Sequence, residues 1–436
     1  MMLNEEVRTT CPYCGVGCGL VASRRLGKPK AITGDPDHPA NGGRICSKGS
    51  ALIETLDLEG RLLHPVVCGM ETNWETALSD TARRLSRVIR NHGPDSVAFY
   101  VSGQLLAEDY YVANKLMKGF IGSANIDTNS RLCMASSVAG HQRAFGEDIV
   151  PGNYEDLELA DLIVLVGSNT AWCHPVLYQR MVSGERAARP RSVVIDPRRT
   201  ATCDGASLHL ALKPGTESFL FNGLLADLAR RGAVDRAFVE RNTEGFDAAL
   251  AEARSSAPDT MAVARACELA VDDVERFFAW FAENEKTVTL YSQGVNQSSS
   301  GTDKVNAIIN CHLATSCVGR PGMGPLSLTG QPNAMGGREV APERRRWGKE
   351  RLQRCPAPRK RRQVARFLPL ATCCLLLDEE TLAAARPRLP AARTPRNGRR
   401  AGSLAACCLQ CSCASVRRRP ARRQRPLPRP RSGWAR

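Results

Sequence analysis

The chain has 436 residues and 43% apolar content, enough for two or three domains with at least one large core. Its net charge of +16 is unevenly distributed: residues 341–436 hold 26 basic and 5 acidic side chains, whereas residues 1–340 hold 34 and 39. This mildly acidic body argues against nucleic acid as a partner. The longest apolar runs are far too short to cross a bilayer, so we expect no membrane partner either.

Three cysteines stand within eight positions near the start of the chain. With the next cysteine they give the spacing C-x2-C-x3-C-x27-C, formed by Cys11, Cys14, Cys18 and Cys46. A close triplet followed by a distant single suits a 4Fe-4S cluster, in which each iron takes one thiolate. Structural zinc is the alternative, but it normally shows two close pairs. The spacing therefore predicts a small 4Fe-4S module over residues 1–60, with these four thiolates as metal ligands.

Residues 61–340 alternate short β-rich runs with amphipathic stretches. We expect strands within 96–103, 160–170, 191–200 and 286–294, and helices within 174–187, 217–232 and 301–316. This alternation predicts an α/β region with a largely parallel sheet. Each strand runs into a Gly-, Asn-, Ser- or Pro-rich loop, where helix N-termini can present N–H groups to phosphate. One such loop could be an ordinary connection, but the repeated pattern favours a large, phosphate-bearing ligand.

The last 96 residues, 341–436, differ in kind from the rest. They hold 24 arginines against 2 lysines, 11 prolines and 7 cysteines, and they contain no Ile, Met, Tyr or His. A disordered basic arm is one interpretation of this composition. An out-of-frame reading of a GC-rich gene is the other, and we favour it because basic arms usually mix Lys with Arg. We therefore expect a disordered or non-native tail.

Several motifs carry a family resemblance that runs from about Thr9 to Val340. They are "CPYCGVGC", "GRICSKG", "NIDTNSRLCMASSVAG", "GSNTAWCHP", "VVIDPRRT", "YSQGVNQSSSGTDKVNAIIN" and "GRPGMGPLSLTGQPNAMGGRE". This set resembles molybdenum oxidoreductases of the bis(molybdopterin guanine dinucleotide) type, and among them most closely the cytoplasmic assimilatory nitrate reductases. The resemblance implies an α/β fold in which the 4Fe-4S module precedes multi-layer, Rossmann-like domains of the DMSO-reductase type. It also implies a 4Fe-4S cluster and molybdenum bis(molybdopterin guanine dinucleotide) as cofactors.

The resemblance assigns two residues to electron transfer and metal binding. Cys133, in "NSRLCMASS", matches the protein ligand to molybdenum, and a soft thiolate suits such a metal. Lys48, just after the fourth cluster cysteine, matches a lysine between cluster and pterin that helps electron transfer. Without the motifs, a lone cysteine is more often a small buried hydrophobe and a lysine a surface residue.

Two further residues of the implied catalytic set bear on the substrate. Formate dehydrogenases of this family have His and Arg where this chain has Met134 and Thr329. Such a pair can accept a proton and hold a carboxylate. The resemblance therefore favours reduction of nitrate to nitrite by oxygen-atom transfer, in nitrate assimilation. A formate dehydrogenase-like enzyme and an inactive truncated fragment that keeps only the cluster are the alternatives.

The resemblance also implies contacts to the dinucleotide cofactor from the strand-end loops and nearby segments. Besides Lys48 and Cys133, the implied contacts are Gln104, Asn129, Gly167, Ser168, Asn169, His174, Asp196, Pro197, Arg198, Gly215, Thr216, Gln293, Asn296, Gln297 and Gln331. The implied electron donor is a protein or domain of the NADH-flavoprotein, ferredoxin or flavodoxin kind. Because "MMLNEEVRTT" has no apolar h-region, we expect a cytoplasmic location. The family continues far beyond Val340, so the sequence leaves open whether this chain alone holds the molybdenum cofactor.

Overall fold

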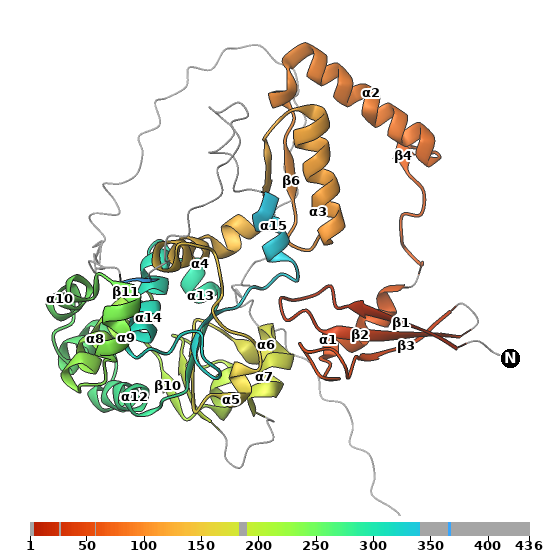
Figure 1. The fold of residues 1–436 in the computed structure, drawn as a ribbon. Coiled ribbons are helices and arrows are strands. Elements are labelled where there is room, and N and C mark those ends of the chain that lie inside the picture. Colours follow the sequence, from red (N-terminus) through yellow and green to blue (C-terminus); the bar gives the residue numbers. More distant parts are fainter. Residues whose placement is uncertain (1–3, 26–27, 57, 183–189, 341–364, 368–436) are drawn as a thin grey trace, which may run out of the picture. The chain divides into compact units, whose positions relative to one another are not determined.

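The computed structural model describes residues 4–25, 28–56, 58–182, 190–340 and 365–367 (Figure 1). The chain divides into two compact units, residues 1–374 and 375–436, and every described residue belongs to the first. None of the helices that the structure describes combines the length and apolar content needed to cross a membrane.

The N-terminal segment is a small antiparallel sheet with the order β1-β2-β3. Its strands are β1 (Asn4–Thr10), β2 (Gly19–Arg25) and β3 (Lys28–Gly34), followed by the short helices α1 (Ser47–Ser50) and η1 (Ala51–Leu56). Thr10 pairs with Gly19, so the loop 11–18 with its three cysteines is the connection of the first hairpin. The hairpin thereby gathers the close cysteine triplet at one end of the sheet.

A five-stranded parallel sheet forms the centre of the α/β region. Its order is β10-β9-β8-β12-β13, with β8 (Leu162–Val166), β9 (Arg191–Ile195), β10 (Leu208–Leu210), β12 (Thr287–Tyr291) and β13 (Gly324–Ser327). Three of the four predicted strands lie in this sheet, which confirms the prediction of a parallel α/β core. The chain adds strands on one side of β8 and then on the other, so the order reverses between β8 and β12.

The strands of this sheet bury both faces, and the two faces pack against different segments. Leu162, Val164 and Val166 of β8 belong to one apolar cluster, whereas Ile163 and Leu165 belong to another. This is the period of two that places alternate side chains on opposite faces. The first cluster receives α8 (Glu217–Arg230), α10 (Phe246–Ser256), α11 (Thr260–Cys267), α12 (Val271–Glu283) and α14 (Gly301–Ala314). The second receives α5 (Asp156–Leu159), α7 (Pro175–Val182) and the cysteine loop.

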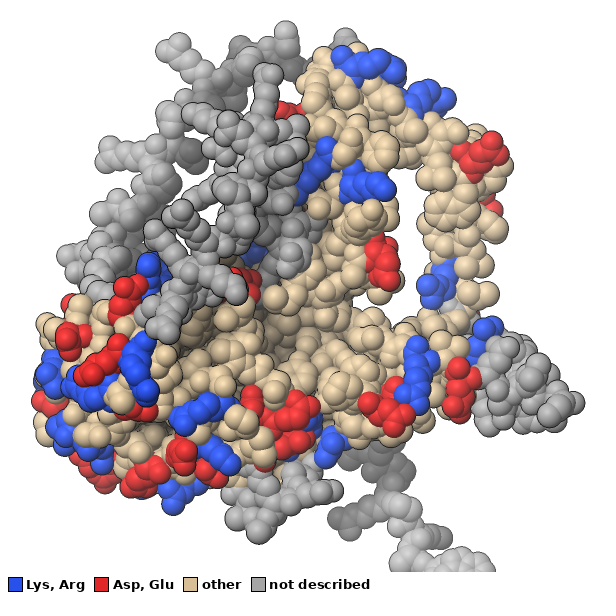
Figure 2. Space-filling view, in the orientation of Figure 1, with Lys and Arg blue, Asp and Glu red and all other residues tan. Residues whose placement is uncertain are grey.

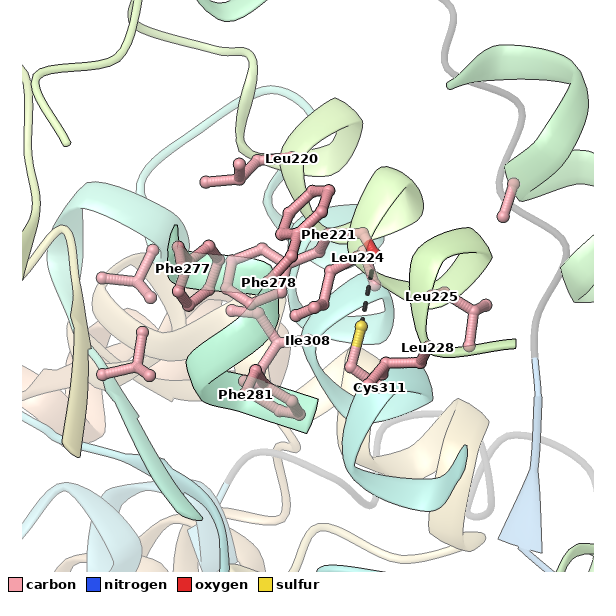
Figure 3. Close-up of a cluster of buried hydrophobic side chains, with 14 of the residues drawn as sticks. Leu220, Phe221, Leu224, Leu225, Leu228, Phe277, Phe278, Phe281, Ile308 and Cys311 are labelled. Atoms are coloured by element: carbon pink, nitrogen blue, oxygen red, sulfur yellow. Dashed lines mark hydrogen bonds between the residues drawn. The ribbon is translucent and has the colours of Figure 1, made fainter. Parts of the chain in front are cut away.

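The first cluster contains a group of packed aromatic side chains. Figure 3 shows Phe277, Phe278 and Phe281 of α12 beside Phe221 of α8, and the rings of Phe221 and Phe277 meet edge to face at 6.2 Å. The Cys311 thiol on α14 donates to the carbonyl oxygen of Phe221 at 3.2 Å (Figure 3). Because these groups are fully buried, this face works as the main hydrophobic core.

The fourth predicted strand lies elsewhere. β6 (Phe99–Val101) pairs in parallel with β7 (Ile126–Thr128) in a separate two-stranded sheet. This part has its own small core, formed by Val97, Tyr110, Met117 and Ile126. It also contains β4 (Val66–Val67), β5 (Met70–Glu71), α2 (Trp74–His92), η2 (Pro94–Ser96), α3 (Ala107–Asn114) and the π-helix η3 (Lys115–Ile121). The strand prediction was right, but its placement in the main sheet was wrong, because alternation alone does not say which strands pair.

The remaining elements connect these parts. They are α4 (Ser130–Phe145), α6 (Thr170–Cys173), η4 (Ala201–Gly205), α9 (Arg236–Asn242), β11 (Thr243–Glu244), α13 (Gln293–Asn296) and α15 (Ala334–Val340). Figure 2 shows basic and acidic side chains interspersed over the surface around α8, α9, α10 and α12. That mixture agrees with the nearly balanced charge of residues 1–340.

Most of the expected tail lies outside the described residues. The segment 365–367 is described, and it packs as part of the body. β14 (Ala365–Arg366) pairs with β11, and Phe367 is only 2% exposed, with its ring 5.0 Å from that of Phe246. For these three residues the expectation of a structureless tail does not hold, because an isolated apolar residue in an arginine-rich stretch can still reach a core.

Candidate metal and cofactor site

The four cysteines of the predicted cluster lie within electrostatic reach of one another. Cys11, Cys14 and Cys18 are buried and Cys46 is half-buried, and no disulfide joins any of the described cysteines. Burial, and to a smaller extent the three other cysteines, raise the pKa of Cys18 to about 12. Four thiols held together away from water can be ionised only if positive charge is supplied, which iron does. These residues therefore fit a 4Fe-4S cluster.

Backbone contacts shape the loop that carries three of these cysteines. The amide of Cys11 donates to the carbonyl of Cys18 at 2.8 Å, and Gly17 adopts a positive φ of 66°. Among the described residues, no three His, Cys, Asp or Glu side chains converge closely enough to hold a single metal ion.

The cysteine loop lies directly against the loop that follows β13. A Cβ atom on Gly15 would stand 2.2 Å from the carbonyl oxygen of Thr329, so only glycine allows this approach. The Tyr154 hydroxyl donates to the carbonyl of Gly15 at 3.0 Å. The predicted cluster and one of the predicted catalytic residues are thus neighbours.

The charge of Lys48 affects groups on both sides of the contact between Gly15 and Thr329. Lys48 lies on α1 and is exposed. Burial raises the pKa of Cys11 and Cys14, and the positive charge of Lys48 opposes part of this rise. The same charge contributes to lowering the pKa of His174, although burial of the imidazole is the larger cause. Lys48 therefore stands near both the cluster thiols and His174, which follows the end of β8.

His174 is a buried side chain with one unused nitrogen. Its Nε2 donates to the Thr329 carbonyl at 2.7 Å, which fixes the tautomer of the neutral ring. Its Nδ1 therefore carries a lone pair, and this buried atom has no hydrogen-bond partner. A ligand with an N–H or O–H donor would satisfy it. This fits a pterin, whose ring system carries N–H groups.

The loops after β8, β9, β12 and β13 meet at one edge of the sheet, because parallel strands share their carboxyl ends. The closest approach is between Gly167 and Gly294: a Cβ on Gly167 would lie 2.7 Å from the Gly294 Cα. These glycines follow β8 and β12, the pair between which the strand order reverses. Open α/β sheets bind ligands at such a switch point.

The polar side chains of the β8 and β9 loops are held by internal hydrogen bonds. The Thr202 hydroxyl donates to Asn169 Oδ1 at 2.9 Å, and Ser168 bonds to Thr170. Asp196 is buried and accepts the Arg198 amide at 2.9 Å. Pro197 and the Arg198 guanidinium are exposed beyond it. This exposed pair can contact a ligand, whereas Asp196 shapes its loop.

Cys133 lies one turn into α4 and faces α13. The amide of Cys133 bonds to the carbonyl of Asn129, and its Sγ accepts from Gln293 Nε2 at 2.7 Å. The Asn129 side chain accepts the Gly103 amide at 2.8 Å, next to the exposed Gln104. Gln331 Oε1 accepts from the Ser130 hydroxyl at 3.4 Å. The structure therefore brings three of the implied cofactor contacts, Asn129, Gln293 and Gln331, to the start of α4.

Met134 and Thr329 line the same cavity. Its volume is about 260 Å³, and its other lining residues include Gly15, Tyr154 and Asn333. The two residues that the sequence links to substrate choice therefore converge, although 195 positions separate them. Neither residue is charged, and the described lining of the cavity contains no cationic side chain that could bind a carboxylate.

Some implied contacts lie further away or have their polar groups engaged. Gly215 and Thr216 follow β10, the edge strand, and the Thr216 hydroxyl donates to the Lys213 carbonyl at 2.7 Å. Asn296 is buried, and its amide bonds to Met134 Sδ and to the Ser137 hydroxyl. Gln297 is exposed beyond α13. Their contacts to the cofactor stay predictions.

Several residues that shape the site carry no signal in the sequence. Arg180 donates to the carbonyls of Pro39 and Ala40 at 2.8 and 2.9 Å and so attaches the cluster module to α7. Tyr154, Thr202 and Ser292 likewise contact distant segments, Ser292 through the carbonyl of Leu328. Only the fold reveals such contacts.

Comparisons with known proteins agree with this geometry. Residues 61–372 match the family model for molybdopterin oxidoreductase, and residues 4–57 match that for the molybdopterin oxidoreductase Fe4S4 domain. The chain belongs to the molybdopterin oxidoreductase family. Its cofactors are therefore a 4Fe-4S cluster and molybdenum bis(molybdopterin guanine dinucleotide), as the sequence predicted. The domain limits at residues 60 and 340 stay predictions.

Two curated relatives illustrate the range of similarity. The chain is 54% identical over 370 residues to the nitrate reductase of Klebsiella oxytoca, a match that covers 80% of the chain and 42% of that protein. It is 30% identical to the F420-dependent formate dehydrogenase subunit alpha of Methanocaldococcus jannaschii, covering 76% and 48%. The chain thus spans less than half the length of these relatives.

A solved structure shares the fold. The acetylene hydratase of Pelobacter acetylenicus aligns with a TM-score of 0.57 at 19% sequence identity, covering 70% of this chain and 42% of that one. At this identity the match supports the fold alone.

Proposed function

We propose that the chain contributes the cluster and the metal ligand to a molybdenum nitrate reductase that reduces nitrate to nitrite. The observation that carries the proposal is the cavity shared by Met134 and Thr329, which lies against the cysteine loop. It has no His and Arg pair of the kind that would take formate. The greater identity to a nitrate reductase than to a formate dehydrogenase supports the same choice.

The residues fall into two groups, those that bind the cofactor and those that supply it with electrons. The molybdenum cofactor, when bound, supplies two-electron oxygen-atom transfer, and the protein supplies position and access. Cys133 offers a soft thiolate to the metal, and the glycines of the β8 and β12 loops leave room for the dinucleotide. His174 Nδ1 offers an acceptor to a donor group of the cofactor.

Electron entry is assigned to the cluster thiolates Cys11, Cys14, Cys18 and Cys46. Because Gly15 touches Thr329 and the Lys48 charge acts on both the thiols and His174, the cluster lies beside the cofactor pocket. We infer that a separate donor protein or domain, of the flavoprotein, ferredoxin or flavodoxin kind, reduces this cluster.

We also infer an assimilatory role and a cytoplasmic location. The support is the sequence resemblance to cytoplasmic assimilatory enzymes. Cell fractionation tests it directly: the protein should be recovered with cytoplasmic markers, and recovery with periplasmic markers would contradict it.

The test of the activity uses the full chain, purified without oxygen. Reduced methyl viologen supplies the electrons, nitrite is the readout, and iron and molybdenum are counted in the same sample. We expect nitrite formation with nitrate, and no viologen reduction with formate. Formate-dependent dye reduction would favour the dehydrogenase instead. Iron without molybdenum and without nitrite would favour a fragment that keeps only its cluster.

A further inference from the structure

The amide of Gln293 contacts the sulfur that is assigned to the metal. Gln293 Nε2 lies 2.7 Å from Cys133 Sγ, and 160 positions separate these residues in the chain. Gln293 begins α13 at the end of β12, whereas Cys133 lies on α4. The contact therefore joins α4 to α13, the helix that follows β12 at the switch point of the sheet.

Ser292 fixes which end of the amide faces the sulfur. The Ser292 hydroxyl, which is buried, donates to Gln293 Oε1 at 2.5 Å. A hydroxyl donor on the oxygen leaves the NH2 group of the amide pointing at Cys133. The Ser292 Oγ also lies 3.1 Å from the Leu328 carbonyl, and its backbone amide reaches Val166 at 3.4 Å. The residue that orients the amide is thus tied to β8 and to the segment after β13.

The surroundings leave the Gln293 side chain little freedom. A Cβ on Gly330 would stand 3.6 Å from Gln293 Nε2, so the amide lies between Cys133 and the loop that carries Thr329. Such a position suits a group that acts on the metal ligand. The sequence suggested a contact of Gln293 with the dinucleotide cofactor, and any such contact away from Cys133 would need the side chain to turn.

An N–H group directed at a ligating thiolate changes how that thiolate behaves. It stabilises negative charge on the sulfur and withdraws electron density that the sulfur would otherwise donate to the metal. A metal bound to a less donating ligand is easier to reduce, so its reduction potential rises.

We propose that Gln293, oriented by Ser292, is a positioning residue that hydrogen-bonds the Cys133 thiolate and tunes it as a metal ligand. This inference rests on the proposed function in one respect, since it takes Cys133 as the molybdenum ligand. The hydrogen bond itself is a property of the protein without cofactor.

The first test is the rate at which iodoacetamide alkylates Cys133, measured at one fixed pH by peptide mass spectrometry. The full chain is compared with Gln293→Leu, which keeps the side-chain size and removes the donor, and with Ser292→Ala. The exposed Cys68 serves as an internal reference. Loss of the donor lowers the fraction of Cys133 that is thiolate, while the thiolate that remains is more nucleophilic and offsets part of this, so we expect the leucine variant to react about three to ten times more slowly.

Gln142→Leu is the matched control, since Gln142 lies on the same helix as Cys133 but is exposed and belongs to no implied site. It should react at the wild-type rate, and Ser292→Ala should show a smaller decrease than Gln293→Leu. Equal rates in wild type, Gln293→Leu and Ser292→Ala would overturn the proposal. If Gln293→Leu fails to fold, which alkylation of the buried Cys311 would reveal, the rate in Ser292→Ala still tests the proposal.

The second readout is the midpoint potential of the molybdenum centre, followed by electron paramagnetic resonance. Gln293→Leu should lower it relative to wild type and to Gln142→Leu, and an unchanged potential would count against the tuning role. Absence of molybdenum from every chain, wild type included, would contradict the proposed function. The alkylation rates would still decide whether Gln293 acts on Cys133.

Discussion

The two faces of the five-stranded sheet are built from the same strands and yet serve different purposes. On one face, Phe221, Phe277 and Phe281 pack with other apolar side chains into a core without metal ligands. On the other face, the strands contact the cysteine loop and α7, and the buried Arg180 reaches across to the cluster module. Alternation of side chains along β8 lets one strand stabilise the fold and support a site at once.

The largest expected effect is the loss of the iron-sulfur cluster from the second face, where two buried cysteines can be compared. Cys18→Ser should abolish the cluster, because a 4Fe-4S cube needs four protein ligands and serine is a poor substitute. Cys203 is also buried in this apolar cluster but is no predicted ligand, so Cys203→Ser is the matched control. Iron and sulfide counts are the measurement. Equal iron loss in both variants would mean that this face is merely a core.

On the first face, a substitution should lower the free energy of unfolding and leave the cluster intact. Phe277→Ala removes a fully buried ring, and a change of this kind costs about 3–5 kcal/mol of unfolding free energy. Chemical denaturation should show this loss, while the folded fraction keeps its full iron content. A variant that stays folded but loses iron would contradict the separation of the two faces.

Arg180→Ala tests the attachment of the module to the sheet. Arg180 is 4% exposed and bonds two backbone carbonyls and Glu158, so its loss leaves buried acceptors without a donor. We expect a loss of about 3 kcal/mol, together with faster release of iron to a chelator. Arg191→Ala, which removes an exposed ion pair at 3.7 Å, should change stability by less than about 1 kcal/mol. Similar losses in both variants would argue against a specific role for Arg180.

The smallest effect, taken per pH unit, concerns His312 beside the first face. Burial lowers the pKa of His312 from 6.5 to about 3, so the unfolded chain binds this proton first as the pH falls. The contribution of His312 is present above about pH 6.5 and is lost toward pH 3, by about 1.4 kcal/mol per pH unit.

Denaturation curves at several pH values measure this slope. His312→Asn should reduce by one the number of protons taken up on unfolding, and so reduce the slope of unfolding free energy against pH by about 1.4 kcal/mol per pH unit. Thr289→Val removes the partner of His312 Nε2 at 2.8 Å but keeps the imidazole, so it should lower stability and leave the slope in place. Identical slopes in the wild type and His312→Asn would show that the buried imidazole is not responsible.

The sequence predicted the parts of the molecule that depend on local patterns. The cysteine spacing, the strands β8, β9 and β12 and the helices α7, α8 and α14 could all be read from neighbouring residues. The contact of Gln293 with Cys133 could not, because it depends on how α4 and α13 pack. Burial of Phe367 escaped prediction for the same reason, since composition described its surroundings as a tail.

The central claim is that electrons pass between the cluster and a site that takes nitrate. The most direct measurement is to reduce the full chain with dithionite, remove the excess and follow the visible absorbance of the cluster after nitrate is added. The account predicts that nitrate restores the oxidised spectrum, whereas buffer alone does not. A cluster that stays reduced with nitrate, and is reoxidised only by ferricyanide, would contradict it.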